Sequence, residues 1–246
     1  MTRYRADRMM VHKGLVPSRE QAQALIEAGH VVADGKQVKK ASQKLPEDSV
    51  LQLEGIGTMR VSRAGEKLDH SLEHFELEVS GAVCLDIGAS TGGFTEVLLR
   101  KGANRVYAVD VGHDQLAETL RQDSRVVSLE GTNARHLTRL EIPEDIDVLV
   151  CDASFISLTK VLEKAVYFVK PDGVMVTLVK PQFEVGRGRV GRGGLVREPE
   201  LHEEVSRTAI AWLESLPGWR CLGLTDSPIT GTQGNREFLM AGCRDL

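Results

Sequence analysis

Two apolar segments of the sequence end in a polar residue that could take part in catalysis. Asp152 follows the segment Asp147–Cys151, and Lys180 follows Val174–Val179 and precedes Pro181. In an open parallel sheet, ligands bind beyond the carboxyl ends of the strands, so both side chains are predicted to face a ligand. Because burial disfavours the charged form of an amine, Lys180 is a candidate general base.

A glycine-rich segment, DIGASTGGF, begins at Asp86 and joins an apolar strand to a helix. Gly88 and Gly93 match the first and last places of the dinucleotide-binding fingerprint, but Ser90 occupies the middle place. The glycine normally found there lets the backbone approach a pyrophosphate, so NAD is disfavoured. S-adenosylmethionine has no pyrophosphate and is favoured. Asp110, at the end of the second strand, is placed to accept hydrogen bonds from the ribose hydroxyls of such a cofactor.

Asn133 follows the third expected strand and could bind the edge of an adenine ring, because its amide offers both a donor and an acceptor. A plain turn in the loop explains the same residue, and both interpretations stay open. The predicted cofactor-binding residues are Asp86, Gly88, Ala89, Ser90, Thr91, Gly92, Gly93, Asp110, Val111, Asn133 and Asp152.

The elements that must position these residues alternate between strand-like and helix-like segments from about Arg63 onward. This alternation predicts parallel strands joined by crossover helices, in an α/β domain with a seven-strand sheet. The expected strands are Ala82–Ile87, Arg105–Val109, Arg125–Ser128, Asp147–Cys151, Val174–Val179, Cys221–Thr225 and Glu237–Ala241. The expected helices are Gly93–Lys101, His113–Arg121, Leu158–Val169 and Pro199–Glu214.

The first 45 residues carry a net charge of +5, whereas the rest of the chain carries −9. They are predicted to form a small α+β unit with a helix at Ala6–Lys13, a helix capped by Ser18, a hairpin at Asp34-Gly35 and a strand at Val50–Leu53. A basic unit joined to an acidic body suggests a polyanionic partner. If only the charge is considered, a charged surface in contact with solvent is an equally good explanation.

The segment SREQAQALIEAGHVVADGKQVKKASQKL resembles the S-four-like (alpha-L) RNA-binding module. The resemblance implies that basic residues at the helix starts and beyond the hairpin bind folded RNA. The matching residues in this chain are Arg3, Arg5, Arg8, Ser18, Arg19, Lys36, Lys39 and Lys40. The corresponding domain boundaries are 1–58 for the RNA-binding domain, 59–63 for a linker and 64–246 for the catalytic domain.

Two further features of the catalytic part suggest RNA contacts. The segment Gly186–Arg197 has five glycines and four arginines, which is typical of a mobile basic loop over a site and makes Arg187, Arg189 and Arg192 candidates for phosphate contacts. Phe155, close to Asp152, could stack on a flipped-out base, although packing in the core is an equal alternative.

Seven segments closely resemble the TlyA family of ribosomal RNA 2'-O-methyltransferases, which have an FtsJ-like catalytic domain and an older haemolysin label. They are VSRAGEKL, DIGASTGGFTEVLL, VYAVDVG, EGTNARHL, CDASFISL, LVKPQFEVG and GNREF. The resemblance implies the Rossmann-like class I methyltransferase fold, with a mostly parallel sheet. It also implies a catalytic Lys-Asp-Lys-Glu tetrad, matched here by Lys67, Asp152, Lys180 and Glu237. Taken alone, Lys67 and Glu237 would be interpreted as surface residues.

The family resemblance further implies that the substrate is cytidine ribose in ribosomal RNA, within a ribosomal subunit or free. The chain ends soon after its last expected strand, as in members that modify the large subunit only, although small-subunit RNA is also a family substrate. The linker MRVSR departs from the aromatic-containing linker of some members, which leaves open how the domains are coupled.

Other functions are less compatible with the sequence. A membrane-active haemolysin would need an apolar span or a strongly amphipathic helix, and we find neither, so a cytoplasmic location is expected. A non-catalytic ribosome-binding factor would not need the complete tetrad. No metal site is expected, because the histidines do not cluster. The sequence does not predict an oligomeric state.

Overall fold

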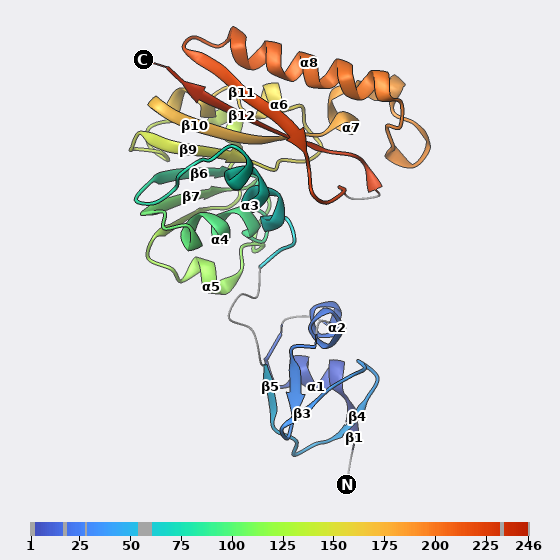
Figure 1. The fold of residues 1–246 in the computed structure, drawn as a ribbon. Helices are drawn as coiled ribbons and strands as arrows, with labels where there is room; N and C mark the ends of the chain where they lie inside the picture. Colours follow the sequence, from blue (N-terminus) through green and yellow to red (C-terminus); the bar gives the residue numbers. More distant parts are fainter. Residues whose placement is uncertain (1–2, 17–18, 28, 54–60, 232–233, 246) are drawn as a thin grey trace. The chain divides into compact units, whose positions relative to one another are not determined.

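The computed structural model describes residues 3–16, 19–27, 29–53, 61–231 and 234–245 (Figure 1). The chain divides into two compact units, residues 1–59 and 60–246, each of which is described by itself. Within the described residues, none of the helices is both long and apolar enough to cross a membrane.

The N-terminal unit has two helices and two small sheets around a core of aliphatic side chains. One sheet has the strand order β3-β2-β5, and the other pairs β1 with β4. The elements are β1 Arg3–Arg5, α1 Ala6–His12, α2 Arg19–Glu27, β2 Val31–Ala33, β3 Lys36–Gln37, β4 Lys44–Pro46 and β5 Leu51–Leu53. Strands β1 and β4 were not expected, because segments of only three residues are too short to show an alternating apolar pattern.

The expected hairpin is confirmed. Asp34 and Gly35 both have positive φ angles, 50° and 75°, as a two-residue hairpin turn requires. Gly29, with φ 81°, follows α2 in the left-handed conformation that ends many helices. Ser18, the expected cap of α2, lies outside the described residues.

A buried carboxylate organises two arginines of this unit. The side chain of Asp7 is fully buried, and both of its oxygens accept hydrogen bonds of 3.0 Å from the guanidinium of Arg5. Arg19 and Gln23 donate to Oδ2 at 2.9 and 3.2 Å. These donors, Arg5 foremost, hold the pKa of the Asp7 carboxyl well below its usual range.

Acid should therefore destabilise the N-terminal unit through Asp7. A lowered pKa in the folded state contributes stability above the unfolded value of about 3.9, and that stability is lost as the pH falls below it. We expect Asp7→Asn to weaken the unit at pH 7 and to flatten its loss of stability between pH 5 and pH 3. Urea titrations followed by NMR signals of residues 3–53 measure this, with the exposed Asp48→Asn as control. Equal slopes for Asp7→Asn and wild type would contradict it.

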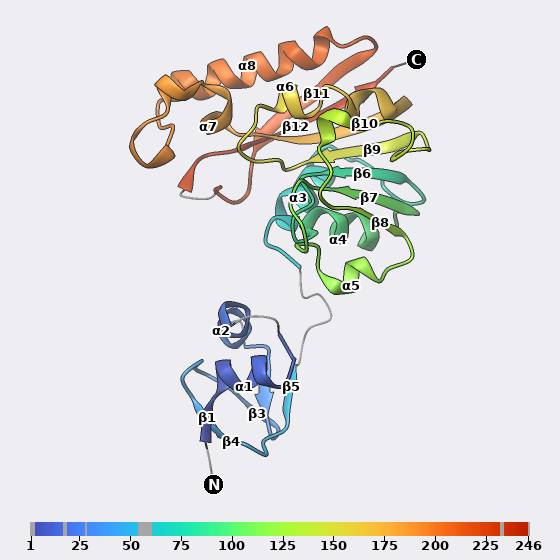
Figure 2. The ribbon, with the colours of Figure 1, turned by 180° about the vertical axis from the view of Figure 1, so that it is seen from behind.

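The C-terminal unit is built on a seven-strand sheet with the order β11-β12-β10-β9-β6-β7-β8, and this confirms the expected fold class (Figures 1 and 2). The strands from β10 through β8 are parallel, and β12 is antiparallel to both of its neighbours. The strands are β6 Val83–Ile87, β7 Arg105–Val109, β8 Val126–Leu129, β9 Ile146–Cys151, β10 Val169–Val179, β11 Trp219–Asp226 and β12 Phe238–Arg244.

Helices cover both faces of this sheet, and each face has its own apolar core. One core includes side chains of α3, α4 and α5, and the other includes those of α6, α8 and the short η2 helix. The helices are α3 Gly65–His74, α4 Gly93–Arg100, α5 Glu118–Arg121, α6 Leu158–Val161, α7 Pro181–Glu184 and α8 Pro199–Ser215, with 3-10 turns η1 Ala134–His136, η2 Ala165–Phe168, η3 Arg187–Arg189 and η4 Arg192–Gly194.

Two helices were predicted too long. The expected helix 113–121 begins only at Glu118, because Asp114 is left-handed and the backbone N–H groups of Gln115 and Leu116 donate to the side chain of Glu130 instead of to a helix. The expected helix 158–169 is two short pieces, α6 and η2, and its last residue already belongs to β10. Apolar residues at helical spacing predict a helix, but they do not show that a distant side chain such as Glu130 binds the backbone N–H groups.

Candidate active site

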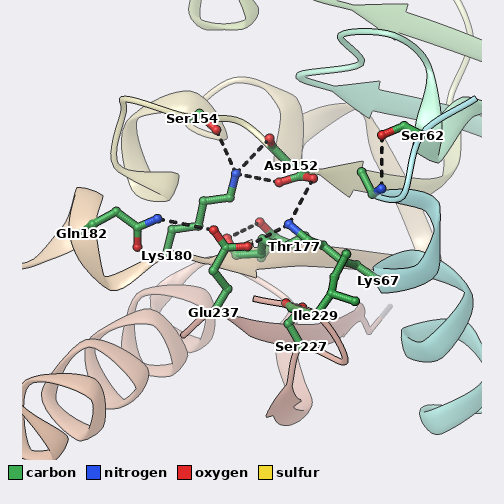
Figure 3. Close-up of polar contacts among 12 residues, drawn as sticks. Ser62, Lys67, Asp152, Ser154, Thr177, Lys180, Gln182, Ser227, Ile229 and Glu237 are labelled. Carbon is green, nitrogen blue, oxygen red and sulfur yellow. Dashed lines mark hydrogen bonds and ion pairs between the residues drawn. The ribbon is translucent and has the colours of Figure 1, made fainter. Parts of the chain in front are cut away.

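The four residues of the expected tetrad lie together at the carboxyl edge of the sheet (Figure 3). Lys67 comes from α3, Asp152 follows β9, Lys180 follows β10 and Glu237 precedes β12. Lys180 Nζ lies 2.6 Å from Asp152 Oδ1, and Lys67 Nζ lies 3.6 Å from Asp152 Oδ2 and 2.7 Å from Glu237 Oε2. Residues from four elements thus form one chain of alternating charge.

Three of these charged residues are almost fully buried, with exposed fractions of 7% for Lys67, 6% for Lys180 and 4% for Glu237. Buried charges are costly unless each has a partner, and here each amine contacts a carboxylate. The Asp152 carboxylate lies between the two amines and offsets their repulsion (Figure 3).

Sequence reasoning missed two polar neighbours of the tetrad. Lys180 Nζ also donates to Ser154 Oγ at 3.0 Å and to the Asp152 carbonyl at 3.2 Å. Gln182 Nε2 donates to Glu237 Oε1 at 3.3 Å. Each missed residue stands two positions after a tetrad member, and this spacing was the only available signal.

The tetrad lines a cavity of about 320 Å³. Part of the lining comes from the glycine-rich turn, and another part comes from Ile229, Thr230, Gly231, Asn235 and Glu237, which precede β12. Besides the tetrad, the polar lining includes Ser62, Arg63, Ser90, Thr91, Ser154, Gln182, Thr230 and Asn235. A ribose with its hydroxyls is compatible with such a lining.

The glycine-rich turn is held tightly against the loop after β9. Gly88 has φ 80°, and a Cβ there would come within 2.9 Å of the Ala153 backbone, so only glycine fits. Ser90 has φ 48°, and its N–H donates to Asp110 Oδ2 at 2.8 Å. Gly112 donates to Asp110 Oδ1 at 2.8 Å. The carboxylate is therefore fixed, and each of its oxygens keeps a second lone pair for a ligand.

A second cavity, of about 560 Å³, opens beside this turn and has Gly88, Ser90, Asp152, Ser154 and Phe155 in common with the first. Its lining includes the predicted cofactor-binding residues Gly88, Ser90, Asp110, Val111, Asn133 and Asp152. Ala89, Thr91 and Gly93 line the first cavity instead. The two cavities meet at Asp152, so a cofactor in one could present a group to an acceptor in the other.

Two predicted cofactor-binding residues, Asp86 and Gly92, line neither of these cavities. Asp86 is fully buried and accepts a hydrogen bond of 2.7 Å from Thr95 Oγ1, and burial raises its pKa to about 7. Gly92 has φ 98°, and a Cβ there would lie 2.2 Å from Leu120 Cδ1. Asp86 and Gly92 therefore shape the glycine-rich turn through contacts with Thr95 and Leu120 and do not line either cavity.

Asn133 fits both interpretations that the sequence left open. Its Oδ1 accepts a hydrogen bond of 3.1 Å from the Arg135 N–H and caps the turn Ala134–His136. Asn133 also lines the second cavity, so it can contact a ligand there while it caps the turn.

Phe155 is presented to solvent and does not pack in the core. Its side chain is 92% exposed, and its φ of 66° is unusual for an aromatic residue. The ring lies 5.3 Å from that of Phe183, and the residue lines both cavities. A strained backbone that exposes an aromatic ring beside a site favours the base-stacking interpretation.

The expected RNA contacts are mostly exposed, and some already have protein partners. Arg3, Arg8, Lys36, Lys39, Lys40 and Arg192 are exposed. Arg5 and Arg19 hold Asp7, and Arg189 forms an ion pair with Glu204. Arg187 lies in the η3 turn, and Ser18 is outside the described residues. No cluster of three potential metal ligands occurs among the residues that the structure describes.

Comparison with known proteins identifies the family. The model of FtsJ-like methyltransferases matches residues 60–244, and that of the S4 domain matches residues 5–51. The 16S/23S rRNA (cytidine-2'-O)-methyltransferase TlyA of Mycobacterium tuberculosis is 46% identical over 97% of this chain and 89% of the relative. The chain belongs to the TlyA family. The 23S rRNA (cytidine-2'-O)-methyltransferase TlyA of Campylobacter jejuni is 33% identical over 93% of this chain and 95% of the relative.

Other relatives bear the haemolysin name. Hemolysin A of Brachyspira hyodysenteriae is 42% identical over 96% of this chain and 98% of the relative. A solved structure of a hemolysin-named protein from Streptococcus thermophilus is 41% identical, with a TM-score of 0.74, and covers 100% of this chain and 90% of that one. Family membership makes this chain an S-adenosylmethionine-dependent methyltransferase.

The residues around the second cavity fit the cofactor. Asp110 can accept hydrogen bonds from ribose hydroxyls, and Gly88, Ser90 and Asn133 line the same cavity. We expect Asp110→Ala to weaken S-adenosylhomocysteine binding about 10- to 100-fold. This factor corresponds to the usual free-energy contribution of hydrogen bonds to a charged group.

Isothermal calorimetry on the full chain measures this, with NAD as the ligand expected not to bind. Asp110→Asn keeps one acceptor oxygen and should weaken the binding less than Asp110→Ala does. Unchanged affinity in Asp110→Ala, or measurable NAD binding to wild type, would refute the assignment.

Proposed function

We propose that this chain transfers a methyl group from S-adenosylmethionine to the ribose 2'-hydroxyl of a cytidine in ribosomal RNA. The observation that carries the proposal is the meeting of two cavities at Asp152, one lined by the tetrad and one by Asp110. The names of the Mycobacterium and Campylobacter relatives support cytidine in rRNA as the substrate. Large-subunit RNA is the favoured target, and small-subunit RNA is a second one. A ribosomal substrate implies a cytoplasmic enzyme.

Lys180 is the proposed general base of the reaction. A ribose hydroxyl is a poor nucleophile and must lose its proton as it attacks. The bound cofactor supplies an electrophilic methyl group on a sulfonium. Asp152 holds Lys180 in place and Glu237 holds Lys67, through the contacts of 2.6 and 2.7 Å. Both amines are almost fully buried at the wall of the cavity.

RNA binding is proposed to be divided between the two parts of the chain. Residues 1–58 hold folded RNA with Arg3, Arg5, Arg8, Ser18, Arg19, Lys36, Lys39 and Lys40, residues 59–63 are the linker, and 64–246 perform catalysis. In the catalytic part, Arg187, Arg189 and Arg192 contact phosphates, and Phe155 stacks on the flipped-out base. The exposure of the Phe155 ring and the S4 match at residues 5–51 support this division.

The direct test is to incubate the protein with methyl-labelled cofactor and one of four substrates: each purified ribosomal subunit and its naked RNA, taken from cells that lack the modification. We expect label in large-subunit RNA, and comparison of the subunit with its naked RNA identifies the true substrate. Incorporation into protein only, or into none of the four, would exclude the proposal.

A further inference from the structure

The surroundings of Lys180 contain one group that the tetrad does not explain. Lys180 Nζ has three polar neighbours: Asp152 Oδ1 at 2.6 Å, the Asp152 carbonyl at 3.2 Å and Ser154 Oγ at 3.0 Å. Figure 3 shows the Ser154 hydroxyl directed at the amine.

The three neighbours differ in what they can do. The carboxylate and the carbonyl of Asp152 only accept hydrogen bonds, whereas a serine hydroxyl both donates and accepts. A base acts through its lone pair. Among these three neighbours, only the Ser154 hydroxyl can donate a hydrogen bond to the lone pair of a neutral Lys180.

Ser154 is also accessible to solvent, whereas Lys180 is not. Only 6% of Lys180 is exposed, whereas Ser154 is exposed and lines both cavities. It therefore lies where an acceptor hydroxyl would meet a methyl donor. A hydroxyl in the first cavity reaches Ser154 Oγ without displacing either contact between Lys180 and Asp152.

We propose that Ser154 is a further catalytic residue, a proton shuttle between the ribose 2'-hydroxyl and Lys180; this rests on the proposed function. As the 2'-oxygen bonds to the methyl carbon, the carbon–sulfur bond breaks and its electrons stay on sulfur. The 2'-proton passes to Ser154 Oγ, and the serine proton passes to Lys180 Nζ. The positive charge moves from sulfonium to ammonium, which later releases its proton to water, so the balance is complete.

The test compares single-turnover rates at saturating RNA for Ser154→Ala, Ser154→Thr and Ser157→Ala. The Ser157 hydroxyl, in the same loop, bonds Glu184 at 2.7 Å and lines neither cavity, so it is the matched control. We expect the rate of Ser154→Ala to fall about 10-fold or more, which is less than the roughly 100-fold minimum usual for a lost general base because water can partly replace the hydroxyl. Ser154→Thr keeps a hydroxyl and should stay near wild type, as should Ser157→Ala.

A second measurement needs neither cofactor nor RNA. The NMR signal of the Lys180 side chain, assigned with Lys180→Met, should move in Ser154→Ala and stay in place in Ser157→Ala. Because Ser154 also lines the second cavity, the rates are compared at saturating S-adenosylmethionine, so that a change in cofactor affinity does not enter them. A wild-type rate in Ser154→Ala, with Lys180→Met inactive, would show that Lys180 takes the proton directly and would overturn the shuttle alone. An active Lys180→Met would instead overturn the proposed general base.

Discussion

Lys180→Met is expected to lower the single-turnover methylation rate by a factor of about 100 to 10,000, the usual cost of losing a general base. Methionine keeps a similar apolar stem but cannot accept a proton. RNA and cofactor should still bind, because Lys180 is almost fully buried and the second cavity does not include it.

Lys180→Arg distinguishes the loss of the proton acceptor from the loss of the positive charge. A guanidinium can still pair with Asp152, yet it stays protonated at any workable pH, so the rate should fall nearly as far as in Lys180→Met. If either variant kept a near-normal single-turnover rate, Lys180 would only position the substrate and the mechanism would have to be abandoned.

Deletion of residues 1–58 is expected to have the second large effect, on RNA binding. The deleted part contains the +5 segment, whereas both cavities are lined by residues of the other unit. Cofactor affinity should stay close to wild type. RNA affinity should fall, and the slope of log affinity against log salt should shrink by about 0.7–0.9 for each phosphate that the protein no longer neutralises.

Full-length variants control for any effect of the deletion on folding. The simultaneous change of Lys36, Lys39 and Lys40 to Ala removes three exposed charges around the hairpin and should reduce the salt slope by about 2–3. Filter binding at several salt concentrations gives both values. An unchanged affinity and slope in the deleted and the triply substituted protein would contradict the proposed division of labour.

The sequence predicted the sheet well because its strands are short, apolar runs bounded by turns. Arg105–Val109 has the same bounds in the structure, and the other six strands overlap their predicted ranges. Helix lengths were less predictable, because Glu130 takes the backbone N–H groups that the expected helix 113–121 would have used. β10 begins earlier than expected, through the irregular pairing between Val169 and Val174.

The candidate site was predictable where a residue ends a strand. Asp110, Asp152 and Lys180 follow strands, so topology brings them to one edge. Lys67 and Glu237 were inferred only through the family resemblance, since α3 and β12 meet the site through tertiary packing. Apart from its position two residues after Asp152, Ser154 carries no sequence signal, because its proposed role depends on a contact with a lysine 26 residues later.

The central claim is methylation of a cytidine ribose, and the position of the methyl group tests it most directly. Ribosomal RNA treated with the wild-type protein and cofactor should be digested to nucleosides and analysed by mass spectrometry against synthetic standards. The account predicts 2'-O-methylcytidine with wild type and almost none with Lys180→Met at the same time point. A methyl group on a base, or on the ribose of another nucleoside, would contradict the account.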